Sequence, residues 1–104
     1  MPNANYISGY RAECLCRNDL REQGYTVIRA AGSKGKIDLC AVNGTEIRLI
    51  QVKNKKHIIK PEELKALQRL QVPANASVEI WERVNGAWSI RWWDESSKTW
   101  AVWG

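Results

Sequence analysis

Three polar residues near the ends of two neighbouring predicted strands could hold a metal ion against a phosphate. Asp38 lies on the first strand, and Gln51 and Lys53 lie on the second. Because side chains repeat every two residues along a strand, Gln51 and Lys53 share one face and lie roughly 6.6 Å apart. An acid, an amide oxygen and an ammonium group brought together in this way predict a metal-and-phosphate site. Magnesium suits such a site, because it prefers hard oxygen ligands and keeps several of its waters.

A predicted β-hairpin places these side chains. The Asn-Gly pair at 43–44, which lies between two apolar runs, predicts a two-residue turn. On the first arm, period-two alternation points Asp38 away from Ile37 and Leu39. On the second arm, Gln51 continues the apolar side of the strand, which predicts a partly enclosed polar end.

The remaining pattern predicts a mixed α/β domain. A first helix over 6–23 has an apolar stripe that includes Leu15, with Glu13 at its edge. A second helix begins at Pro61 and extends to 71. The predicted strands cover residues 25–30, 37–42, 47–53, 77–84, 87–93 and 99–103. The order of helix, three strands, helix and two to three strands predicts one mixed β-sheet flanked by helices.

Length and composition limit the class of protein. With 104 residues, 44% hydrophobic and 26% charged, the chain is expected to form one globular domain over 1–104. No apolar run approaches the ~20 residues of a membrane span, and the N-terminus lacks a signal-peptide pattern, so a cytoplasmic location is expected. Three cysteines outside any C-x-x-C spacing favour reduced thiols over zinc or disulfides. A net charge of +5 favours a polyanionic partner, nucleic acid first and an anionic membrane surface second.

Several charged residues near the predicted site have two interpretations. Lys55, Lys56 and Lys60 form a solvated run by default, yet they follow the site directly, where DNA would pass. Glu13 is either a surface acid or a member of the site. His57 is interpreted as a surface residue.

Three motifs in this order resemble the PD-(D/E)XK nuclease superfamily, and within it the archaeal-type Holliday junction resolvases. They are G-x-x-x-E at 9–13, R-x-A-G-S-x-G-K-x-D at 29–38 and Q-V-K at 51–53. The resemblance implies a restriction-endonuclease-like fold and a metal-dependent, structure-selective endonuclease of recombination and repair. Such an enzyme would cut four-way DNA junctions as a homodimer, with Mg²⁺ or Mn²⁺ and no small-molecule cofactor. The chain would act in a prokaryote or in a phage- or virus-infected host cell.

The resemblance also implies a role for each site residue. The catalytic group comprises Glu13, Ser33, Asp38, Gln51 and Lys53. Within it, Asp38 would be the central metal ligand and Gln51 the second, while Ser33 would hold a phosphate. The Val52 carbonyl would supply a further metal ligand, and Glu13 would bind in the outer shell or through water. The DNA-binding residues would be Arg29, Lys34, Lys36, Lys55 and Lys56.

Gln51 stands where these nucleases usually have glutamate, so weaker metal affinity is expected. Two other interpretations follow. One is a restriction- or repair-type nuclease of the same superfamily, and the other is a non-catalytic DNA-binding module with a weakened metal site. The six tryptophans are explained either by the core or, more readily, by a dimer interface.

Overall fold

The computed structural model describes residues 4–30, 37–54 and 59–103, and in the first helix it describes side chains from Tyr10 onward. The helices and strands are α1 (Ala4–Glu22), β1 (Thr26–Arg29), β2 (Leu39–Val42), β3 (Ile47–Asn54), α2 (Pro61–Gln68), β4 (Ala76–Val84), β5 (Ala87–Asp94) and β6 (Thr99–Trp103). No helix among these residues is long and apolar enough to cross a membrane.

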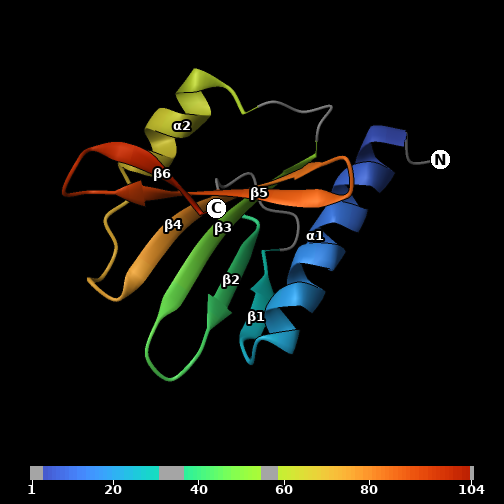
Figure 1. The fold of residues 1–104 in the computed structure, drawn as a ribbon, viewed down its shortest axis with the longest axis horizontal. Helices are drawn as coiled ribbons and strands as arrows, with labels where there is room; N and C mark the ends of the chain where they lie inside the picture. The colour runs from blue at the N-terminus through green and yellow to red at the C-terminus, as the bar shows by residue number, and fades with distance from the viewer. Residues whose placement is uncertain (1–3, 31–36, 55–58, 104) are drawn as a thin grey trace.

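The six strands form one sheet in which spatial order follows chain order, from β1 to β6 (Figure 1). All neighbouring strands are antiparallel except β3 and β4, which run parallel. A parallel pair requires a crossover connection, and this one carries α2. The predicted mixed sheet with flanking helices is therefore confirmed, with three strands after α2.

Helix α1 packs on one face of the sheet, beside β1, β2 and β3 (Figure 1). Its buried side chains follow the four-residue spacing of one helix face, and they are Ala12, Cys16 and Leu20. Leu15, predicted in the same stripe, is 37% exposed, because it lies toward the edge of this face. Gly24 has a positive φ of 96° and ends the helix in the left-handed conformation that glycine adopts most easily.

Helix α2 packs on the opposite face, where Leu67 contacts a cluster that includes Ile80 and Trp93. Proline starts this helix as predicted, but the helix ends at Gln68 and not at 71. The N–H of Leu70 bonds to the Leu67 carbonyl, so the chain tightens into a turn before it reaches β4. The sheet is thus covered on both faces, although by a different helix over each half.

The two hairpin turns differ. At 85–86, Asn85 and Gly86 have φ of 51° and 78°, so two residues connect β4 to β5 as the sequence predicts. The predicted two-residue turn at 43–44 is wrong, because four residues separate β2 from β3. There the Asn43 side chain accepts hydrogen bonds of 2.9 Å from the N–H groups of Thr45 and Glu46, which holds a wider turn.

A buried polar network lies on the α1 side of β3 and β4. Arg48 donates two hydrogen bonds of 2.8 Å to Glu79, a carboxylate that is 0% exposed. Ser77 and Trp81 donate to the same carboxylate. The Arg48 guanidinium also lies over the rings of Tyr25, Trp81 and Trp103, at 4.9 to 5.4 Å. Every charge in this network therefore has an opposite charge or an aromatic face beside it.

Candidate active site

The backbone of Asp38 is held between two strands. Its N–H donates to the Ile50 carbonyl at 2.8 Å, and its carbonyl accepts from the N–H of Ala30 at 2.9 Å. Asp38 lies in a bend directly before β2. The predicted alternation therefore begins only at Leu39, which packs on the α1 side, whereas Ile37 packs against the α2 side. Bonds to both neighbours fix the direction in which the Asp38 side chain leaves the sheet.

The Asp38 carboxylate is bound by the next strand of the sheet. Its Oδ2 accepts hydrogen bonds from the backbone N–H of Val52 at 2.8 Å and from Nε2 of Gln51 at 3.0 Å. Gln51 is 9% exposed, which confirms the predicted enclosed polar end of β3. A neutral amide can donate this hydrogen bond, whereas an ionised glutamate at the same position could only accept.

Burial raises the pKa of Asp38 to about 6. The hydrogen bond from Val52 opposes this rise, and the negative charge of Glu13 adds to it. The positive charges of Lys53 and Arg29 lower the pKa by smaller amounts. Four of the predicted site residues thus act on one carboxyl group, which confirms that the fold brings them near one another. Because burial makes the ionised form of Asp38 unfavourable, a cation bound beside the carboxylate would stabilise that form.

Glu13 and Arg29 form an ion pair between α1 and the end of β1. The distance from Arg29 Nε to Glu13 Oε1 is 3.7 Å, and the Glu13 side chain is 18% exposed. The Arg29 guanidinium also stacks over the ring of Tyr10, 4.9 Å from its centroid. Tyr10 was not predicted as part of this group, although it lies three residues before Glu13 and hence on the same helix face.

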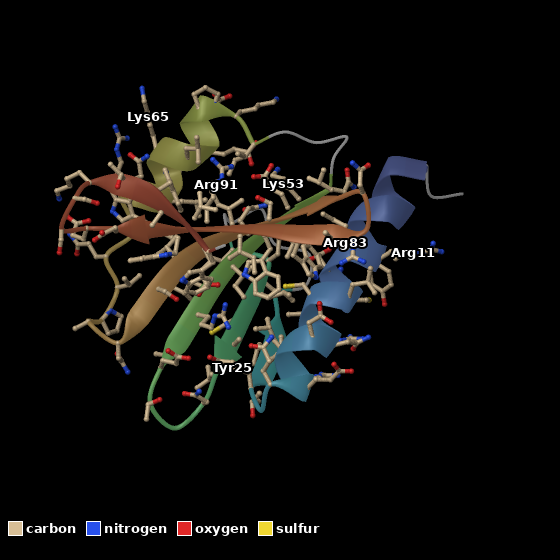
Figure 2. The ribbon with its side chains drawn as sticks, in the orientation of Figure 1. Arg11, Tyr25, Lys53, Lys65, Arg83 and Arg91 are labelled. Atoms are coloured by element: carbon tan, nitrogen blue, oxygen red, sulfur yellow. The ribbon has the colours of Figure 1, made fainter. Side chains whose placement is uncertain are left out.

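Lys53 lies near the end of β3, on the side of the sheet that faces α2 (Figure 2). Its Nζ is 2.9 Å from Oε2 of Glu63, on the first turn of α2. Opposite charges at short range favour the ionised form of both groups, which would be expected of Lys53 and Asp38. Lys53 does lower the pKa of Asp38, but the ion pair that Lys53 makes is with Glu63. Sequence reasoning missed Glu63 because an acid in a first helical turn already has a role at the helix terminus.

The described side chains offer a sparse set of oxygen donors. Within residues 4–30, 37–54 and 59–103, no three His, Cys, Asp or Glu side chains gather closely enough to hold a metal. The available oxygens are those of Asp38, Gln51, Glu13 and the Val52 backbone. This set fits Mg²⁺, which binds through one or two carboxylates and retains water ligands, and it lacks the nitrogen and sulfur ligands typical of a structural zinc site.

The remaining predicted site residues lie outside the described part of the chain, and they are Ser33, Lys34, Lys36, Lys55 and Lys56. Of the residues predicted to bind DNA, Arg29 is described, and Lys60 of the basic run after the site is exposed at the N-cap of α2. The three cysteines are unpaired in the structure, and of these only Cys16 is buried. Burial raises the pKa of the Cys16 thiol far above its ordinary value, so this thiol stays protonated and takes no part in the site.

Comparison with known proteins identifies the family. The family model for the archaeal Holliday junction resolvase (Hjc) matches residues 4–99. Among solved structures, the chain is similar to Hjc of Archaeoglobus fulgidus, a Holliday junction resolvase from an archaeal hyperthermophile. That match has 24% identity and a TM-score of 0.63, and it covers 77% of this chain and 72% of the other. A search of curated protein sequences gives no match. With the fold and nearly the whole chain matched, the protein belongs to the archaeal Holliday junction resolvase family, a family of structure-selective junction endonucleases.

Proposed function

We propose that the chain, as one nuclease domain over 1–104, resolves four-way DNA junctions by Mg²⁺-dependent hydrolysis. It would leave 5′-phosphate and 3′-hydroxyl ends. The observation that carries the proposal is the Asp38 carboxylate, which is partly buried, held by Gln51 and Val52, and surrounded by Glu13, Arg29 and Lys53. We also propose a cytoplasmic location, in a prokaryote or in a phage- or virus-infected host cell.

Asp38 would be the central ligand of the metal, with the oxygens of Gln51 and Val52 beside it and Glu13 in the outer shell. Bound Mg²⁺ neutralises charge on the phosphate and lowers the pKa of a water that attacks it. Mn²⁺ would substitute, because it accepts the same carboxylate, carbonyl and water ligands.

The cationic side chains act on the DNA itself. Arg29 lies at the end of β1, next to the strand that Asp38 precedes, and its side chain is 36% exposed. It can therefore exchange its long 3.7 Å contact with Glu13 for a phosphate oxygen. Lys53 would orient the attacking water or stabilise the charge that develops on the phosphate. Ser33 would hold the phosphate, and Lys34, Lys36, Lys55 and Lys56 would add contacts to the DNA backbone.

We propose that the active form is a homodimer. Cutting two opposed strands of one junction requires two sites related by a twofold axis, which a symmetric dimer provides. Large apolar side chains that remain exposed, Val102 at 66% and Trp103 at 45%, lie on the last strand of the sheet. They favour an interface formed partly by this strand.

Incubation with a labelled four-way junction and with a matched linear duplex tests the proposal, each with Mg²⁺ or with EDTA. Paired, symmetric cuts in the junction alone, dependent on Mg²⁺, are the expected result. Equal cutting of both substrates would instead indicate a restriction- or repair-type nuclease. Junction binding without cuts under any metal would indicate a DNA-binding module whose metal site is lost through Gln51.

A further inference from the structure

We infer that Glu63 is a positioning residue that holds the Lys53 ammonium group at the active site. The inference rests on the proposed role of Lys53 in the reaction. Its basis is the 2.9 Å ion pair between the two side chains, which joins the end of β3 to the first turn of α2. Gln51, two residues before Lys53, is neutral, so the carboxylate beside Lys53 comes from the helix.

The ion pair is partly enclosed, which makes it more than a surface contact. The Lys53 and Glu63 side chains are 18% and 27% exposed. Burial raises the pKa of Glu63, but the hydrogen bond and the charge of Lys53 outweigh burial and bring the pKa below its ordinary value. The Glu63 carboxyl is therefore ionised near neutral pH.

Holding Lys53 in this way leaves it able to act. An ammonium group has three N–H donors, so one bond to Glu63 leaves two for a phosphate oxygen or a water. The lysine side chain is long and flexible, so ordering it costs conformational entropy. A partner that orders it before the DNA arrives lowers the cost of reaching the reactive arrangement.

The position of Glu63 is itself fixed by the helix. Pro61 sets the first helical residue, and a Glu63 carboxylate oxygen accepts from the N–H of Lys60 at 3.4 Å. One turn later, Leu67 is 1% exposed and anchors α2 to the sheet. The segment that connects β3 to β4 therefore places the Glu63 carboxylate beside Lys53, near the C-terminal end of β3.

The variant Glu63→Gln removes the ion pair with Lys53 but keeps the hydrogen bond at the start of α2, because glutamine can still accept from the N–H of Lys60. Glu62→Gln is the matched control, since Glu62 is the exposed neighbour in the same helical turn. With Mg²⁺ and a four-way junction, we expect Glu63→Gln to lower kcat about tenfold while KM stays near that of the unmodified chain. Glu63→Asp should recover part of the rate, because it restores the charge at a shorter reach.

Glu63→Gln with the same kcat as Glu62→Gln would overturn the inference. So would a change in KM alone, because that would place Glu63 in substrate binding. Nitrogen NMR of the Lys53 ammonium group gives a readout independent of activity, and its order should fall in Glu63→Gln and not in Glu62→Gln. Lys53→Met tests the site separately. If Lys53→Met cuts normally, the proposed site is wrong; if it is inactive and Glu63→Gln matches its control, only the role of Glu63 is wrong.

Discussion

The two ion pairs of β3 lie five residues apart and differ in how completely they are enclosed. Arg48 and Glu79 have side chains that are 9% and 0% exposed, and Ser77 and Trp81 complete their hydrogen bonds. Lys53 and Glu63, at 18% and 27%, keep a path to solvent. The Glu79 carboxylate already accepts four hydrogen bonds, whereas the Lys53 ammonium group can still donate to a ligand without leaving Glu63.

The same contrast extends to stability. Glu79 is stabilised by neighbours that donate to it, and the pKa of Arg48 is raised by Glu79 even though burial lowers it. Asp38 is in the opposite situation, because burial and Glu13 make its ionised form unfavourable. The Arg48 end of β3 thus carries a fully paired charge, while the Asp38 carboxyl beside the Lys53 end is ionised at a cost that a bound metal ion would reduce.

The largest expected effect is that of Asp38→Asn, which should abolish cleavage and keep junction binding. Because the folded-state pKa of about 6 exceeds the ordinary 3.8, the ionised carboxyl destabilises the metal-free fold. This effect is absent below pH 3.8 and complete above about pH 6. Near neutral pH and without metal, the free energy of unfolding of Asp38→Asn should therefore exceed that of the parent by about 2 to 3 kcal/mol. Cleavage assays and urea unfolding in EDTA measure both, and near-normal cleavage would remove Asp38 from the site.

Glu79→Ala should have the next largest effect, on stability and not on chemistry. It leaves the Arg48 guanidinium buried without its partner, which costs about 3 to 5 kcal/mol. Glu82→Gln is a control on the same strand, since the Glu82–Arg91 pair is more exposed and its loss should cost about 1 kcal/mol or less. Urea unfolding measures both. If Glu79→Ala lowered the cleavage rate per folded molecule, the Arg48–Glu79 pair would affect catalysis as well as stability, which would contradict the division of roles between the two ends of β3.

The pH dependence of metal binding should locate the Asp38 carboxyl. Protons compete with the metal for this group, so Mg²⁺ affinity should fall by about tenfold for each pH unit below about 6 and level off above it. Calorimetric titration across this range measures the affinity. A flat profile through pH 6 would mean that another group controls binding.

Gln51→Glu should give the smallest change and sharpen the contrast further. A second carboxylate beside Asp38 should raise Mg²⁺ affinity by about tenfold, because ligand charge tunes the affinity of such sites. It should also replace the 3.0 Å hydrogen bond with repulsion, and so lower stability in EDTA. Thermal unfolding with and without Mg²⁺ measures both changes. Unchanged Mg²⁺ affinity would exclude Gln51 as a ligand.

The sequence was sufficient to predict the element order and the residues gathered around Asp38. Period-two alternation placed Gln51 and Lys53 on one face, and the structure confirms that the carboxamide is enclosed beside Asp38. Alternation within one strand, however, contains no information about which residue of a distant helix lies above it. Glu63 could therefore not be assigned to Lys53 before α2 was placed on the sheet.

Two further features have physical causes of the same kind. Nothing in the alternation of β4 indicates that Glu79 is buried, because its partner Arg48 comes from the neighbouring strand and was not assigned from the sequence. The Asn-Gly pair at 43–44 predicts a tight turn, yet the Asn43 side chain bonds to the backbone and stabilises a wider one. Local propensity gives the presence of the turn, and side-chain bonding decides its length.

The order of the strands has a consequence for how the chain folds. Because β1 to β6 lie side by side in chain order, each antiparallel pair can form between segments that are close in sequence. The parallel pair of β3 and β4 closes the longest loop in the sheet, and the entropic cost of closing a loop rises with its length. Such non-local pairing is slow. The two hairpin-containing halves should therefore form early, and the rate of folding should depend on their joining along β3 and β4.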